Sequence, residues 1–142
     1  MTTIFTRIID GEIPGRFVWR DDDVVAFLPI ALLAPGHTLV VPIEPIDHWI
    51  DLDPELNTKV WSVARTISQA LDSIYHPTKV GVLVVGEEVP HAHVHLVPFT
   101  DLRQMSFANQ DSDPAPEALD QQADALRDAL RAAGAGRAVP EP

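Results

Sequence analysis

The feature that most constrains the fold is a strict alternation of histidine with apolar residues. Residues 91–97 have the sequence HAHVHLV, and they hold three of the six histidines in the chain. On a β-strand, side chains two residues apart share one face. The stretch therefore predicts a strand with His91, His93 and His95 on one face, while the apolar residues between them point to the core.

The histidine face is not expected to lie deep in the core, because each buried imidazole needs hydrogen-bond partners. We expect a polar cleft or the surface. Neighbouring histidines stand about 6.6 Å apart on a strand, a spacing that a phosphoryl group could bridge. The pattern alone leaves four interpretations open: a solvated edge strand that arose by chance, a metal site, phosphoryl transfer with an imidazole nucleophile, and a pH-sensing cluster. A metal site would need another ligand, which His37, His48 or a carboxylate could supply.

The rest of the chain predicts an α+β fold with an antiparallel sheet of about five strands. Residues 17–20 (FVWR) and 24–28 (VVAFL) flank an Asp-rich turn and predict a hairpin. Residues 37–42 (HTLVVP) and 80–85 (VGVLVV) predict two further strands. The segment GEEVP between the last of these and the histidine strand is short, so we expect these two to be antiparallel neighbours. Residues 4–9 favour a helical turn.

One long helix is expected to pack on this sheet. Asp53 is a good N-cap and Pro54 suits the first helical position. Apolar residues then recur at steps of three and four through about Tyr75, and His76 and Pro77 end the helix.

The character of the sequence changes at Asp101, which predicts a domain over residues 1–100 and a C-terminal extension over residues 101–142. The extension predicts an amphipathic helix at 116–133 and a frayed end from 134 to 142. The length of 142 residues suits one hydrophobic core.

Charge and composition exclude several classes of partner. The net charge is −11, from 21 acidic and 10 basic residues, and no basic patch is visible, so we expect no nucleic acid partner. No apolar run is long enough to span a membrane. Cysteine is absent, and the first residues mix charges into their apolar stretch, which is unlike a secretory signal. These features favour the cytoplasm.

With its flanks, the histidine motif resembles the histidine triad (HIT) superfamily, whose pattern is His-φ-His-φ-His-φ-φ with φ apolar. HAHVHLV matches this pattern throughout. Residues 4–28 (IFTRIIDGEIPGRFVWRDDDVVAFL) and 34–42 (APGHTLVVP) are similar, in order and spacing, to the opening segments of the Hint-like branch. The resemblance covers residues 3–98.

This resemblance implies a nucleotide hydrolase of the phosphoramidase type, acting at the α-phosphate of a purine mononucleotide conjugate. His93 would attack phosphorus to form a nucleotidyl-histidine, which water then hydrolyses. His95 would bind a non-bridging oxygen, His91 would help hold the site and the leaving group, and His37 would join their hydrogen-bond network. The resemblance implies no cofactor, and it implies a homodimer whose sheets join. The alternatives are a dinucleoside polyphosphate hydrolase or nucleotidyl transferase of the same superfamily, and a nucleotide-binding protein with little catalysis.

The resemblance also implies a substrate pocket. The apolar residues that match its wall are Ile4, Phe5, Ile8, Phe27, Ile30 and Leu39.

The sequence departs from the family pattern in three respects. Pro29 stands where the family commonly has an Asp that holds the ribose hydroxyls, and proline has neither a polar side chain nor an N–H. Losing that hydrogen bond would weaken binding by about 1.5–3 kcal/mol. Glu87 stands where a Gln would contact the phosphate or the leaving group, and an ionised Glu87 would repel a phosphate. Either Glu87 points away, or it is protonated, or it pairs with a cationic leaving group such as an amine. Thr3 and Thr6 occupy the positions of two cysteines that often bind a structural zinc in relatives, so we expect no metal ion here.

Overall fold

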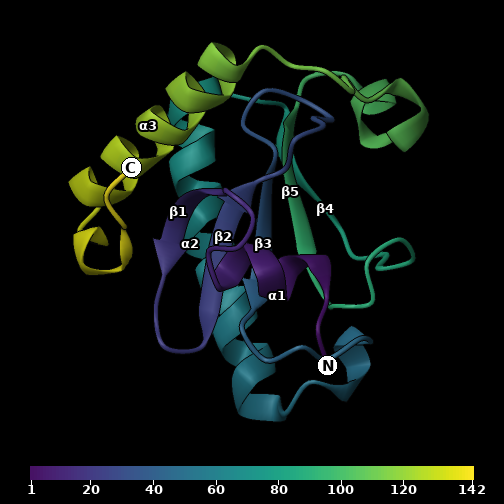
Figure 1. The fold of residues 1–142 in the computed structure, drawn as a ribbon. Helices are drawn as coiled ribbons and strands as arrows, with labels where there is room; N and C mark the ends of the chain where they lie inside the picture. The colour runs from purple at the N-terminus through teal and green to yellow at the C-terminus, as the bar shows by residue number, and fades with distance from the viewer.

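The computed structural model describes residues 1–142, and its architecture is α+β (Figure 1). One antiparallel sheet has the strand order β1-β2-β3-β5-β4. The strands are β1 (Arg16–Arg20), β2 (Val24–Leu28), β3 (Thr38–Pro42), β4 (Lys79–Leu83) and β5 (Val94–Phe99). The α-helices are α1 (Ile4–Ile9), α2 (Pro54–Tyr75) and α3 (Pro116–Ala132), and the short 3-10 helices are η1 (Trp49–Asp51), η2 (Leu102–Met105), η3 (Phe107–Asn109) and η4 (Gly136–Ala138).

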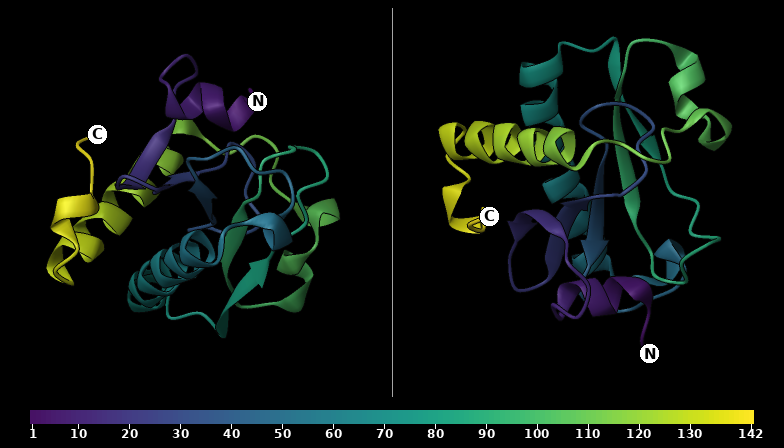
Figure 2. Two further views of the ribbon diagram at one scale, coloured as in Figure 1. Left: turned by 90° about the horizontal axis from the view of Figure 1, so that it is seen from below. Right: turned by 45° about the horizontal axis from the view of Figure 1, so that its top comes forward.

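The sheet separates two apolar layers. Helix α2 lies on one face with α3 beside it, and α1 lies on the opposite face (Figure 2). Alternation along β2 shows the division, because Val24 and Ala26 belong to the large core cluster under α2 and α3. Val25 and Phe27 instead pack with Phe5 of α1. In β5, Val94 and Leu96 also belong to the large cluster, so the side chains at odd positions of both strands face the α1 side.

The predicted hairpin is confirmed. Strands β1 and β2 are antiparallel neighbours, with Phe17 opposite Phe27. A carboxylate oxygen of Asp21 accepts hydrogen bonds from the backbone N–H groups of Asp23 and Val24, both at 2.8 Å. This is the local bonding by which Asp favours tight turns.

The predicted long helix is also confirmed, with one difference in its capping. Asp53 occupies the N-cap position, but its side chain accepts no capping hydrogen bond, and Pro54 begins the helix. The helix ends at His76, which adopts a left-handed conformation with φ of 45°. Pro77 follows and cannot continue the helix.

The two strands next to the site are shorter than predicted at one end. Strand β4 stops at Leu83, whereas the pattern predicted strand to residue 85. Strand β5 begins at Val94, so the prediction of a strand from residue 91 was wrong over its first three residues. The backbone there bonds outside the ladder: the N–H of His91 donates to Val89, and that of Ala92 donates to Ile46. Apolar alternation does not reveal such loop contacts.

The C-terminal extension shares the main core. Leu126 and Leu130 of α3 are fully buried in the cluster that also holds residues of α2 and of the sheet. Arg127 is buried too, and its Nε donates to the carbonyl of Phe17 at 2.8 Å. The last residues, for which we expected fraying, include η4 and the buried Val139. A boundary near residue 100 stays a prediction.

Because α3 contributes to the core, truncating one of its buried side chains should destabilise the whole chain. Leu126 is 1% exposed, and Leu126→Ala should lower the free energy of unfolding by about 2–5 kcal/mol. Leu102 is 76% exposed, so Leu102→Ala is a matched control expected to change it by less than about 0.5 kcal/mol. Urea denaturation measures both. Equal, small effects would show that α3 is not part of the cooperative core.

Candidate active site

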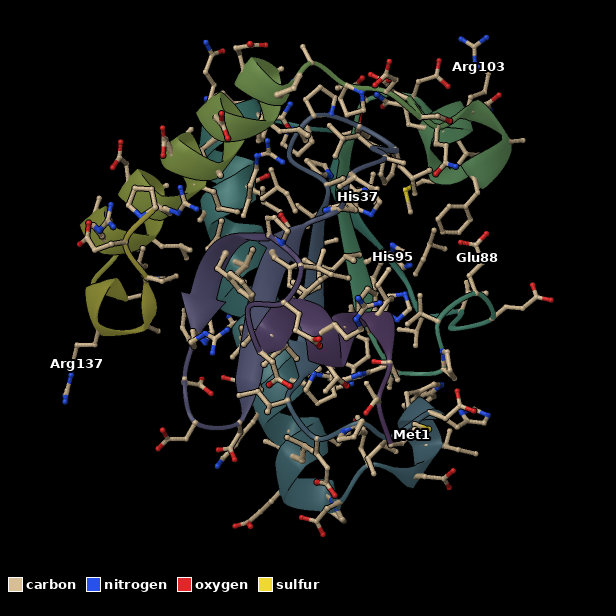
Figure 3. The ribbon with its side chains drawn as sticks, in the orientation of Figure 1. Met1, His37, Glu88, His95, Arg103 and Arg137 are labelled. Carbon is tan, nitrogen blue, oxygen red and sulfur yellow. The ribbon has the colours of Figure 1, made fainter.

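Four histidines gather on the face of the sheet that α1 covers. His95 lies in β5, and His37 directly precedes β3, the strand paired with β5. Figure 3 shows these two side chains close together on this face. His91 and His93 precede β5, and their ring centroids lie 5.7 and 4.8 Å from that of Phe5 in α1. The predicted sharing of one face is therefore confirmed.

The expectation that this face would be a polar cleft or the surface was wrong about depth. The exposed fraction is 0% for His91, 2% for His37, 7% for His93 and 8% for His95. The rings can be buried because every fully buried side-chain nitrogen or oxygen has a hydrogen-bond partner. Only Nε2 of His93 and Nε2 of His95 make no hydrogen bond within the protein, and these two ring nitrogens are therefore not fully buried.

The bond from His37 to His95 has a direction that the backbone determines. The N–H of Leu33 donates to Nδ1 of His37 at 3.0 Å, so this nitrogen carries no proton. In a neutral ring the proton is then on Nε2, which donates to Nδ1 of His95 at 3.0 Å. His95 must therefore carry its own proton on Nε2. That atom has no partner in the protein and is left to donate to a ligand.

His93 has the opposite tautomer. Its Nδ1 lies 2.7 Å from the carbonyl oxygen of His91, and because a carbonyl only accepts, Nδ1 carries the proton. The Nε2 of His93 therefore holds a free lone pair and has no partner in the protein. The rings of His93 and His95 are 4.8 Å apart between centroids. A nucleophilic nitrogen and an N–H donor thus lie side by side.

His91 joins three parts of the fold. Its Nε2 donates to the carbonyl of Pro42 at the end of β3, at 2.7 Å. Its Nδ1 lies 2.8 Å from the hydroxyl oxygen of Thr3, the N-cap of α1. Its backbone carbonyl holds His93. Both nitrogens of His91 are occupied, so this ring supports the site and offers no free nitrogen to a substrate.

All four rings are neutral at pH 7. Burial, followed by the positive charge that His95 and His93 would carry, lowers the pKa of His37 from 6.5 to about 3. Burial and then the charge of His93 lower the pKa of His95 to about 4. Burial is also the main cause of the lowered pKa of His91 and His93. None of the hydrogen bonds of these four rings involves a lysine or an arginine.

Half of the predicted pocket residues form one apolar cluster beside His93. Phe5, Phe27 and Leu39 are buried together, and Ile8 packs against them. The ring of Phe5 stands edge-on to His93, with an angle of 87° between the planes. The contact of this cluster with a base or sugar stays a prediction.

The other predicted pocket residues lie outside that cluster. Ile4 and Ile30 are 49% and 79% exposed, and Pro29 is half-buried just after β2. Glu87 is exposed on the loop between β4 and β5 and makes no hydrogen bond or ion pair. Figure 3 shows its neighbour Glu88 projecting from this loop at the side of the sheet.

Three groups at the site were missed by sequence reasoning. The ring of Phe107 stands edge-on to His95 at 5.2 Å and is 41% exposed, so η3 of the C-terminal extension borders the site. Leu33 contributes only its backbone N–H, and Thr3 contributes a hydroxyl from the start of the chain. Thr3 lies 88 residues from the histidine that it contacts, and Phe107 lies in the C-terminal extension. Leu33 is only four residues from His37, but it acts through a backbone N–H, which no side-chain pattern marks.

The two threonines that replace the zinc-binding cysteines of relatives have a structural role in this chain. Thr3 and Thr6 form a capping box, in which each side-chain oxygen accepts from the backbone N–H of the other. No three His, Cys, Asp or Glu side chains are grouped so as to hold a metal ion. His48 is exposed at the start of η1.

No helix combines the length and apolar character needed to cross a membrane.

Known proteins share both the sequence and the fold. The family model of the HIT domain matches residues 10–102. A HIT-like protein of Borreliella burgdorferi is 38% identical over 102 residues, which are 67% of this chain and 73% of that protein. The adenosine 5'-monophosphoramidase of Saccharomyces cerevisiae is 30% identical over 99 residues, covering 69% of this chain and 63% of that protein.

A solved structure extends the likeness over nearly the whole chain. The crystal structure of a Hit-like protein from Bartonella henselae, 31% identical, superposes with a TM-score of 0.78 and covers 91% of this chain and 97% of that one. Together with the match of the family model and the arrangement of the histidines, these comparisons show that the chain belongs to the histidine triad (HIT) family.

Proposed function

We propose that this chain is a phosphoramidase-type nucleotide hydrolase of the Hint-like branch. It acts at the α-phosphate of a purine mononucleotide conjugate, and His93 is the nucleophile. The observation that carries the proposal is the pair of opposite tautomers: a free lone pair on Nε2 of His93 beside an N–H on Nε2 of His95. The similarity to an adenosine 5'-monophosphoramidase supports the same activity.

In the proposed reaction the lone pair of His93 Nε2 forms a bond to phosphorus as the bond to the leaving amine breaks. The amine leaves with its electron pair and takes a proton from solvent. A water molecule then attacks phosphorus and gives up a proton, and the N–P bond electrons return to His93. Nε2–H of His95 donates to a non-bridging oxygen on which negative charge accumulates. His91 and His37 hold these two rings through the bonds described above.

The charge of the site favours a phosphoramidate over a dinucleoside polyphosphate. The four rings are neutral, and none of their hydrogen bonds involves a lysine or an arginine. The chain as a whole carries a net charge of −11. Several adjacent phosphate charges would find no cation among these groups and would be repelled by this field, whereas a single phosphoryl charge with an amine leaving group would be repelled less.

The proposed nucleoside pocket lies against Phe5, Ile8, Phe27 and Leu39, the apolar cluster beside His93. Ile4 and Ile30 would border its opening. The second candidate function is nucleotide binding with little catalysis. It is favoured by Pro29, which offers no donor or acceptor side chain to a ribose, and by the unpaired carboxylate of Glu87.

We also propose a homodimer that extends the sheet through β4. Strand β4 is at one end of the strand order, so its outer edge is unpaired, and Val82 is 45% exposed on it. A mass measured by light scattering supports this if it is twice that of the chain. A monomer at all concentrations would contradict it.

The His93 nucleophile is tested with a substrate pair. Adenosine phosphoramidate should be hydrolysed by the wild-type chain, and diadenosine tetraphosphate much more slowly. His93→Ala should lower turnover about 10³-fold or more, because the attacking atom is lost, with nucleotide affinity within a few-fold. His48→Ala is the matched control, since His48 is exposed and outside the site, and it should retain full activity.

The outcomes separate the candidates. An active His93→Ala variant would remove His93 as the nucleophile. Faster turnover of the tetraphosphate would favour the polyphosphate hydrolase, and nucleotide binding measured by calorimetry with no turnover of either substrate would favour the binding protein.

The lowered pKa of His93 predicts the pH dependence. Only the neutral ring has a lone pair, so activity falls as pH drops through the pKa of His93, which burial holds below 6.5. The acid limb of kcat/KM should therefore lie below pH 6.5. Rates measured between about pH 4.5 and 8 check this, after subtraction of the His93→Ala rate at each pH and with circular dichroism to confirm folding. An acid limb at or above pH 6.5 would contradict a buried, neutral nucleophile.

A further inference from the structure

Thr3 makes a side-chain contact that its role as the N-cap of α1 does not require. It is the N-cap of this helix and is only 5% exposed. Its hydroxyl oxygen lies 2.8 Å from Nδ1 of His91, across 88 residues of sequence. An N-cap needs only to accept a hydrogen bond from the first turn. The bond to His91 is therefore additional to capping.

The direction of this bond follows from the surrounding groups. Nε2 of His91 donates to the carbonyl of Pro42, so in the neutral ring Nδ1 is the acceptor. The Thr3 oxygen already accepts the backbone N–H of Thr6 at 3.1 Å. The one proton of the Thr3 hydroxyl is thus donated to His91.

The contact continues to His93 through the backbone. The carbonyl oxygen of His91 accepts from Nδ1–H of His93 at 2.7 Å, and this bond keeps the lone pair of His93 on Nε2. The ring of His91 is fully buried, and its nitrogens are held only by Thr3 and Pro42. Removing one of these two partners frees the ring to rotate or to change tautomer, and any shift that this causes in the backbone of His91 would reach His93 through the carbonyl oxygen.

We propose that Thr3 is a positioning residue for the nucleophile. Its hydroxyl proton holds His91 in the Nε2–H tautomer, and the carbonyl of His91 in turn holds His93 with its lone pair toward the substrate. The expected effect of Thr3 on turnover rests on the proposed function. The hydrogen-bond linkage from Thr3 to His93 is a property of the protein without substrate and is tested separately.

Three substitutions separate donation from capping. Thr3→Ser keeps both. Thr3→Asp keeps a good N-cap but offers only acceptor oxygens, so it cannot donate to Nδ1 of a neutral His91. Thr6→Val removes the side-chain half of the capping box but leaves the contact between Thr3 and His91.

The first readout is the nitrogen NMR spectrum of the histidines in the protein without substrate. Wild type, Thr3→Ser and Thr6→Val should show His91 as the Nε2–H tautomer and His93 as the Nδ1–H tautomer. In Thr3→Asp, Nδ1 of His91 should become protonated, and the Nδ1 signal of His93 should shift. Unchanged His91 and His93 signals in Thr3→Asp would overturn the linkage, whatever the activity of the chain.

The second readout is the hydrolysis of adenosine phosphoramidate. Thr3→Asp should lower kcat by about 10- to 100-fold with KM changed less than about threefold, because a small displacement of the nucleophile affects the chemical step. Thr3→Ser and Thr6→Val should stay within about threefold of wild type in kcat. Equal losses in Thr3→Asp and Thr6→Val would overturn the proposal by showing that capping alone matters. If the wild-type chain has no turnover, the proposed function fails, and the spectra alone decide the role of Thr3.

Discussion

The hydrogen bond from Nδ1 of His93 to the carbonyl of His91 is the interaction on which the site depends. Because a carbonyl cannot donate, this bond assigns the proton of His93 to one nitrogen and the lone pair to the other. It also ties the ring to the backbone just before β5. Burial alone would leave the ring free to have either tautomer. With this bond, the ring presents one particular atom.

A second backbone group has the complementary effect on the neighbouring ring. The N–H of Leu33 occupies Nδ1 of His37, and the resulting chain of bonds leaves His95 with a proton on its outer nitrogen. Two histidines of the same strand region thus acquire opposite roles from the polarity of two peptide groups. Protonation of His37 at Nδ1 would place an N–H against the N–H of Leu33. This conflict agrees with the low pKa of His37, about 3.

Burial and the neutrality of the rings together give the site its character. Neutral imidazoles keep their lone pairs at physiological pH, and in the proposed reaction they would hold a phosphoryl group by hydrogen bonds and not by net charge. In a chain with a net charge of −11, this arrangement disfavours a polyanionic substrate. The same burial requires that every inward ring nitrogen has a partner, which is why residues from α1, β3 and the segment before it converge on the histidines.

Much of the fold could be predicted from the sequence, since its signals are local. The Asp-rich turn indicates the hairpin, and the apolar period with Pro54 and His76 delimits α2. Alternation placed the histidines on one face, and the inclusion of His37 came from the family resemblance. The start of β5, the depth of the rings and the contribution of Phe107 could not be predicted, because they depend on contacts between distant segments. Thr3 is the clearest case, since its partner lies 88 residues away.

Trapping of the covalent intermediate would show whether His93 is the nucleophile. Adenosine phosphoramidate is mixed with the chain and quenched with alkali within the first turnover, to preserve the N–P bond, and the peptide that contains residues 91–97 is analysed by mass spectrometry. We expect a nucleotidyl adduct on His93 that forms and decays at the rate of turnover. Turnover without an adduct, or an adduct on His91 or His95, would contradict it.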